Sequence, residues 1–162
     1  MRLRPATPAD AAATAAIYNH EVTTSWVTFD LVTRTVEEQA AWLDARSGAL
    51  EVVVAEVDGG EIAGFASLSP YRDRPAYRTT VEDSVYVHPD HRGEGVGRAL
   101  LEEIVAVARE RGFHAVIGRI VGGHTASIAL HAAVGFEQVG VEREVGRKMG
   151  RWLDVVVMQL LL

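Results

Sequence analysis

Two side chains in this sequence have the chemistry of a proton-transfer pair. Glu82 stands near the start of an apolar segment, where a carboxylate can accept a proton from a nucleophile. His131 falls in a short predicted helix, and its imidazole titrates near neutral pH, so it can give up a proton and regain it. The simpler interpretations are that Glu82 is solvated at the end of a strand and that His131 is a half-buried histidine with its hydrogen bonds satisfied. We expect Glu82 to be a base and His131 to be an acid or an alternative base.

A glycine-rich turn follows Glu82 and predicts an anion site. Ser84–Val87 reads as a buried strand, Pro89 ends it, and apolar residues recur at helical spacing from Val96. Amides at a helix N-terminus lack partners and carry partial positive charge, and glycines let a phosphate approach them. The spacing fits neither a P-loop nor a dinucleotide fingerprint, but it suits a pyrophosphate. The residues expected here are Arg92, Gly93, Glu94, Gly95, Val96, Gly97 and Arg98.

The helix that carries His131 offers two more polar side chains. His124, Ser127 and His131 share one helical face, so the first two can donate hydrogen bonds to a ligand beside the third. Zinc is the other use for two histidines, but no third ligand lies at metal-binding spacing on this helix. We expect no metal.

The loop before Glu82 is rich in arginine. Arg72, Arg74, Tyr77 and Arg78 precede it closely, and a guanidinium suits a carboxylate or phosphinate. A solvated basic loop is the simpler reading of any one arginine. Together with Glu82, the loop favours a small substrate that carries both an amine and an anion.

The composition restricts the classes of protein to which this chain can belong. The chain has 162 residues, of which 48% are hydrophobic and 23% charged, so we expect one domain, residues 1–162. The net charge of −6 argues against a nucleic-acid partner, and no apolar run approaches the ~20 residues of a membrane span. The absence of cysteine excludes thiol catalysis and is compatible with the cytoplasm.

Segments whose apolar residues have the period of a strand alternate along the chain with segments that have the period of a helix. These elements must position the residues described above. We expect an α/β fold whose mixed, mostly antiparallel sheet is flanked by helices. Trp26 and Phe29 fall in an irregular stretch, where plugging the core is favoured and lining a pocket is the alternative. The predicted strands are 3–6, 51–57, 61–69, 84–87, 115–121 and two within 136–162 around residues 146–152; the predicted helices are 7–20, 35–46, 96–111 and 124–134.

The order of these elements and the glycine motif resemble the GCN5-related N-acetyltransferase (GNAT) family. Four further stretches are similar to the phosphinothricin and methionine sulfone/sulfoximine N-acetyltransferases within it. These stretches are Ile17–Val22, Thr80–Pro89, Leu130–Phe136 and Lys148–Asp154. The resemblance covers essentially the whole chain.

The resemblance implies that acetyl-CoA gives its acetyl group directly to the α-amine of a small anionic amino acid, and that the protein is a homodimer. It implies that Glu82 activates the amine through water and that His131 replaces a tyrosine acid common in relatives. Relatives commonly carry asparagine in place of His124, which puts its contact to the cofactor in question. The implied cofactor-binding residues beyond the glycine loop are Val85, Tyr86 and Val87, and the implied substrate-binding residues are Phe29, Arg72, Arg74, Tyr77 and Ser84.

Two other functions fit the same residues. An acetyltransferase of this fold could act on a protein N-terminus or a polyamine, although the arginine loop favours an anionic amino acid. A non-catalytic acyl-CoA sensor would keep the glycine loop but would not need Glu82 or His131.

Overall fold

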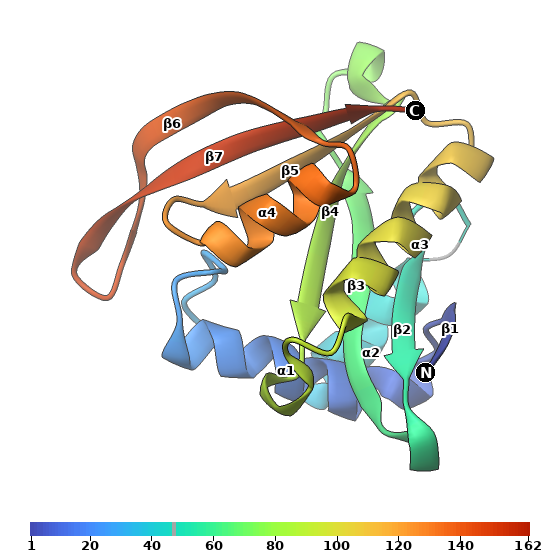
Figure 1. Ribbon diagram of the computed structural model, residues 1–162. Helices are drawn as coiled ribbons and strands as arrows, with labels where there is room; N and C mark the ends of the chain where they lie inside the picture. Colours follow the sequence, from blue (N-terminus) through green and yellow to red (C-terminus); the bar gives the residue numbers. More distant parts are fainter. Residues whose placement is uncertain (47) are drawn as a thin grey trace.

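The computed structural model describes residues 1–46 and 48–162, and in them seven strands form one sheet with helices on both faces (Figure 1). The strands are β1 (Arg2–Pro5), β2 (Val52–Glu56), β3 (Ile62–Pro70), β4 (Thr80–Val87), β5 (Ala115–Val121), β6 (Glu137–Lys148) and β7 (Arg151–Leu161). The α-helices are α1 (Ala11–Thr24), α2 (Val36–Ala45), α3 (Val96–Glu110) and α4 (Thr125–Ala133). Short 3-10 turns are η1 (Pro8–Asp10), η2 (Asp58–Gly60), η3 (Pro75–Tyr77) and η4 (Pro89–His91). The predicted α/β class and order of elements are confirmed.

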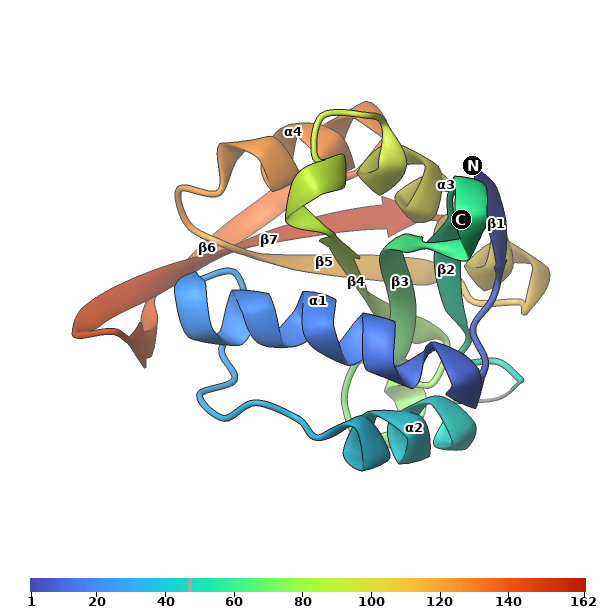
Figure 2. The same cartoon turned by 90° about the horizontal axis from the view of Figure 1, so that it is seen from below.

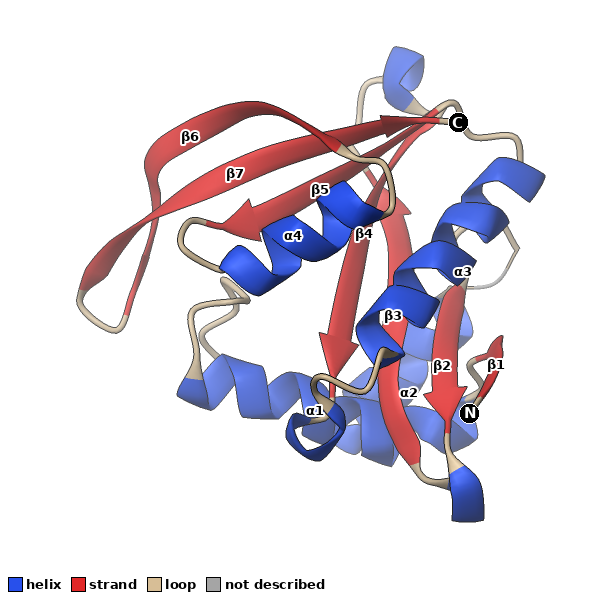
Figure 3. Cartoon of the chain, in the orientation of Figure 1, coloured by secondary structure: helices blue, strands red, loops and turns tan. Residues whose placement is uncertain are grey.

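Two neighbouring strands of the sheet, β4 and β5, are paired over only part of their length. Its order is β1-β2-β3-β4-β5-β7-β6, and only β4 and β5 are parallel. β4 stays paired with β3 as far as Val87, and β5 stays paired with β7 as far as Val121. The ladder between β4 and β5 joins Thr80–Asp83 to Ala115–Gly118 only. Beyond that point the two strands diverge, and the unpaired backbone of β4 faces the gap, as Figure 3 shows.

Helices cover the two faces of the sheet in pairs. Figure 2 shows α1 and α2 on one face and α3 and α4 on the other. Helix α3 is strongly amphipathic, and it buries Leu100, Leu101 and Ile104 completely against the sheet. Each such side chain stabilises the fold by about 1.5–3 kcal/mol relative to an exposed one. Phe65 anchors the smaller core beneath α1 and α2.

Local signals account for several boundaries. The Thr35 hydroxyl accepts a hydrogen bond from the Glu38 amide at 3.1 Å, and the Glu38 carboxylate accepts one from the Thr35 amide at 2.8 Å. This reciprocal cap starts α2 where the sequence predicts it. Helix α1 continues to Thr24, past the predicted end at His20, because hydrophobic and hydrogen-bonded residues remain buried in its last turn. The turn between β6 and β7 is Met149–Gly150 alone, which is shorter than predicted.

The two aromatic residues after α1 are the clearest departure from expectation. Plugging of the core is wrong for both, because the exposed fractions of Trp26 and Phe29 are 39% and 42%. Trp26 lies under the guanidinium of Arg151, and Phe29 lies so closely over Gly146 that a Cβ there would approach its ring to 2.4 Å. These aromatics therefore fasten the loop after α1 to the β6–β7 hairpin. Among the described helices, none is both long and apolar enough to cross a membrane.

Candidate active site

A cleft of about 680 Å³ opens where β4 leaves β5. It brings together most residues expected to hold a cofactor, although they come from β4, the glycine loop, α3 and α4. Glu94 and Val96 are exceptions, because Glu94 pairs with His91 at 2.9 Å and Val96 is buried in the core. The expected residues that line the cleft are Ser84, Val85, Tyr86, Val87, Arg92, Gly93, Gly95, Gly97, Arg98, His124, Ser127 and His131.

The glycine loop has the geometry of an anion site. Gly93 and Gly95 adopt φ angles of 82° and 84°, a left-handed conformation that favours glycine, and Gly95 is the N-cap of α3. No atom beyond the adjacent residues lies within 4 Å of where a Cβ would stand on either residue, and both residues line the cleft. The aligned peptide dipoles of α3 favour negative charge at this end.

Arg92, expected to hold a phosphate, is paired within the protein. Its guanidinium donates to the Glu21 carboxylate from the last turns of α1, and Glu21 also accepts from the Ser25 hydroxyl at 2.5 Å. Sequence reasoning missed Glu21, although its spacing from Ile17 and Tyr18 placed it on the buried face of α1. Arg98 is more exposed and pairs with Glu102 at 2.7 Å.

The acidic residue that meets His131 is Asp83. His131 Nε2 lies 3.0 Å from Asp83 Oδ2, and the exposed fractions of the two side chains are only 5% and 1%. Gly118 of β5 makes room for the pair, because a Cβ there would stand 2.9 Å from the imidazole ring. Burial lowers the pKa of His131, but its bonds to Asp83 and to the Ser127 carbonyl outweigh this and raise it above its ordinary value. Glu82 and Asp83 are adjacent on β4 and point to opposite faces, and the member of the pair that lines the cleft is Asp83.

Glu82 lies on the other face of β4, half-buried near the same end of the cleft. Burial raises its pKa above the ordinary glutamate value, and nearby Asp83 and Glu142 add to the rise. Arg119 of β5 opposes the rise most strongly and Arg72 more weakly. Arg119 lines the cleft and donates to both oxygens of Glu142, and no sequence motif had pointed to it. A carboxylate with a raised pKa is a better proton acceptor near neutral pH.

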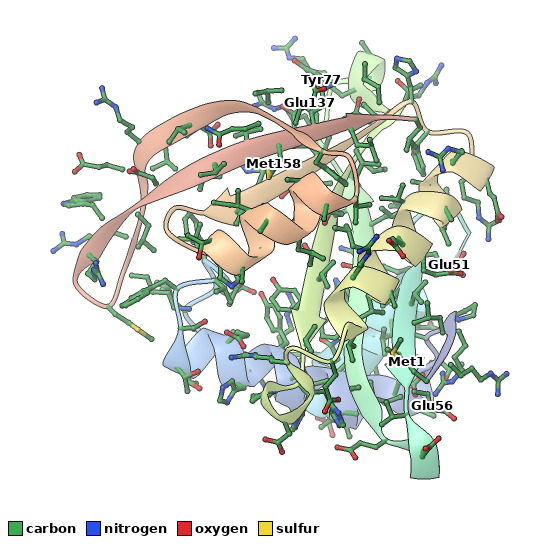
Figure 4. The ribbon with its side chains drawn as sticks, viewed as in Figure 1. Met1, Glu51, Glu56, Tyr77, Glu137 and Met158 are labelled. Carbon is green, nitrogen blue, oxygen red and sulfur yellow. The ribbon has the colours of Figure 1, made fainter. Side chains whose placement is uncertain are left out.

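The arginine loop is only partly joined to this site. Arg72 lies close enough to Glu82 to influence its pKa, and its guanidinium stands over the rings of Tyr71 and Tyr77. Arg72, Arg74 and Tyr77 all line a separate pocket of about 390 Å³ at the start of β4. Figure 4 shows Tyr77 at that end of the molecule, away from the glycine loop. Of the arginines in this loop, Arg72 is the one whose charge influences the pKa of Glu82.

His124 is the second histidine that the sequence offers as a possible zinc ligand. His124 precedes α4, and burial lowers its pKa, which favours the neutral imidazole. In the described part of the chain, no cluster of three histidine, cysteine or acidic side chains could hold a metal ion.

Comparison with known proteins agrees with this architecture. The model of the family described as "Acetyltransferase (GNAT) family" matches residues 16–136. The chain is 40% identical to the L-methionine sulfoximine/L-methionine sulfone acetyltransferase of Salmonella typhimurium, over 100% of this chain and 95% of that one. A phosphinothricin acetyltransferase from Sinorhizobium meliloti, solved in complex with AcCoA, superposes with a TM-score of 0.95 at 40% identity and covers 99% and 88% of the two chains. A ribosomal-protein-alanine N-acetyltransferase from Brucella melitensis superposes with a TM-score of 0.97 at 42% identity over the full length of both.

Proposed function

Because this chain belongs to the acetyltransferase (GNAT) family, we propose that it moves the acetyl group of acetyl-CoA to the α-amine of a small anionic amino acid. The substrates proposed are phosphinothricin, methionine sulfone and methionine sulfoximine, the compounds in the names of similar proteins. The observation that carries the proposal is the cleft between β4 and β5, which joins the glycine loop to the neighbourhood of Glu82.

Three parts of the cleft are suited to binding acetyl-CoA. Open amides at Gly93–Gly97 and the start of α3 suit a diphosphate. The unpaired edge of β4, from Ser84 to Val87, presents backbone groups that can pair with the amides of a pantetheine arm. His124, just before α4, and Ser127 on α4 line the same cleft. When bound, acetyl-CoA supplies the acetyl group in activated form as a thioester.

The protein's own groups then manage protons and charge. Glu82 accepts a proton from the substrate ammonium through water, so that a neutral amine can form the new N–C bond as the C–S bond breaks. His131 lines the cleft where β4 and β5 diverge, and it serves as the acid that supplies a proton to the departing thiolate. Arg72 stands near Glu82 and supports binding of the substrate's anionic group. Phe29, Ser84, Arg74 and Tyr77 remain proposed substrate contacts.

We expect an acetyl-CoA consumption assay to separate the candidate substrates. Phosphinothricin, methionine sulfone and methionine sulfoximine should be acetylated with kcat/KM at least about tenfold above ordinary amino acids. Their phosphinate, sulfone or sulfoximine groups can accept hydrogen bonds that an apolar side chain cannot, and a buried donor left unpaired costs about 1–3 kcal/mol. A peptide with N-terminal alanine belongs in the panel because of the similarity to the Brucella protein. Turnover of the peptide or a polyamine alone would contradict the substrate assignment, and binding without any turnover would favour a sensor.

We also propose a homodimer that forms through the β6–β7 hairpin. β6 is an edge strand of the sheet, and Val139, Val141, Val145 and Trp152 are exposed on this hairpin. An exposed apolar edge of this kind is typical of an interaction surface. The cytoplasm is the proposed compartment, because the reaction consumes acetyl-CoA made inside the cell.

The dimer can be tested at Trp152, whose exposed fraction is 60%. In sedimentation velocity, the wild type should behave as two chains and Trp152→Glu as one, since the change places a charge in an apolar contact. Val32→Glu is the matched control, because Val32 is also exposed but lies outside the hairpin. A wild type that stays monomeric at all concentrations would rule out this interface.

A further inference from the structure

The buried partner of His131 has no role in the reaction described so far. Asp83 is almost fully enclosed, its Oδ2 contacts His131, and its Oδ1 is buried with no hydrogen-bond partner among the described residues. A buried carboxylate is costly unless a cation compensates it. Its position opposite Gly118, where β4 and β5 separate, places it at the inner end of the cleft.

The contacts around the imidazole define its protonation state. Nδ1 lies 2.8 Å from the Ser127 carbonyl oxygen, and Nε2 lies 3.0 Å from the Asp83 carboxylate. The carbonyl oxygen and an ionised carboxylate can only accept hydrogen bonds, so with Asp83 ionised both ring nitrogens donate. The ring that satisfies both contacts is then the imidazolium. In this state His131 is charged and forms an ion pair with Asp83.

This arrangement leaves neither N–H of His131 aimed at the cleft. The Ser127 hydroxyl lies 3.5 Å from Nδ1, and Ser127 lines the cleft one helical turn before His131. A shift of a few tenths of an ångström would bring that hydroxyl within normal hydrogen-bond distance of Nδ1. Ser127 is therefore a route from the enclosed ring to a group bound in the cleft.

We propose that Asp83 is a positioning residue that holds His131 as an imidazolium, and that Ser127 passes the proton of this ring to the departing thiolate. The inference rests on the proposed function. As the C–S bond breaks, its electron pair goes to sulfur, the sulfur takes the Ser127 hydroxyl proton, and Ser127 takes the proton of His131 Nδ1. His131 is left neutral with its Nε2 proton still donated to Asp83, and water restores the missing proton between turnovers.

The surroundings of His131 give the expected direction of the pH dependence. β4 presents Asp83, which favours the charged ring, and the residue before α4 is His124, whose own pKa is lowered by burial so that its neutral form is favoured. Gly118 of β5 and Phe136, whose ring lies edge-on to the imidazole, do not titrate. Removing the Asp83 charge should lower the pKa of His131. Since the protonated ring is the active form, the fall of kcat at high pH should begin at a lower pH.

The first test measures the imidazole itself in the full-length protein. In ¹⁵N NMR spectra of the wild type at pH 7, both ring nitrogens of His131 should carry protons, and in Asp83→Asn the ring should titrate at least one pH unit lower. Asp44→Asn, which alters an exposed carboxylate on α2, should leave the titration unchanged. A neutral His131 in the wild type at pH 7 would overturn the inference, even if Asp83→Asn failed to fold.

The second test follows turnover. Asp83→Asn should move the high-pH limb of kcat down by the same amount as the imidazole titration. Ser127→Ala should lower kcat about tenfold or more, a larger change than the rise in the KM for acetyl-CoA, and Ser127→Thr, which keeps the hydroxyl, should restore most of kcat. An active wild type whose Asp83→Asn variant keeps the same pH profile, or whose Ser127→Ala variant keeps full kcat, would overturn the inference. Failure of the proposed function would instead appear as a wild type that acetylates no amine.

Discussion

Replacing Glu82 by glutamine is expected to lower kcat by about 10²–10⁴, the usual contribution of a positioned general base. Glutamine has nearly the same shape but cannot accept the amine's proton, so the substrate stays an unreactive ammonium. Acetyl-CoA should bind with unchanged affinity in calorimetry, because Glu82 lies on the face of β4 opposite Asp83 and does not line the cleft. The variant thus separates chemistry from cofactor binding.

The pH dependence of kcat/KM gives a second test of the role of Glu82. Burial raises the pKa of Glu82, so its basic form is present only above a higher pH than for an ordinary glutamate. In the wild type, kcat/KM should therefore fall as the pH drops through this raised pKa, and the fall should be absent from the residual activity of the variant. Glu103→Gln, on the exposed face of α3, should behave as the wild type. Full activity in Glu82→Gln would reject Glu82 as the base and leave His131 as the alternative.

Residues whose roles depend on near neighbours in sequence were predicted well. The start of a helix at residue 35 and the glycine loop each follow from a few adjacent residues, because capping and positive φ angles are local requirements. Along β4, Glu82 and Asp83 lie on opposite faces, since the period of a strand is two. These local rules were enough to find the strand, the loop and the helix that form the cleft.

The residues that were missed depend on contacts across the fold. Glu21 and Arg92 are 71 positions apart, and Asp83 and His131 are 48 apart, so no window of sequence contains either pair. Arg119 on β5 donates to Glu142 on β6, so its place in the site depends on how strands distant in sequence are arranged. The ladder between β4 and β5 ends at Gly118, where the missing side chain leaves room for the His131 ring from a distant part of the chain. Sequence could identify the candidate acid but not its buried partner.

The glycine loop offers the sharpest test of how the chain holds its cofactor. Gly95→Val places a branched side chain at a φ of +84°, where such residues are strained, at the N-cap of α3 and next in sequence to its first amides. A hydrogen bond from an amide to a charged group contributes about 1.5–3 kcal/mol, so displacement of even one amide weakens binding by roughly 10- to 100-fold. We therefore expect calorimetry to show a Kd for acetyl-CoA raised by about that factor.

Gly112→Val separates this effect from simple loss of stability. Gly112 has a φ of +80° and, like Gly95, has no other atom within 4 Å of its Cβ position, but it lies beyond the opposite end of α3. The backbone strain of the two variants should therefore be similar, about 1–3 kcal/mol, and both should unfold at a lower temperature. Only Gly95→Val should lose affinity for acetyl-CoA. Equal affinities in the two variants would place the diphosphate away from this loop and would remove the anion site on which the proposed reaction depends.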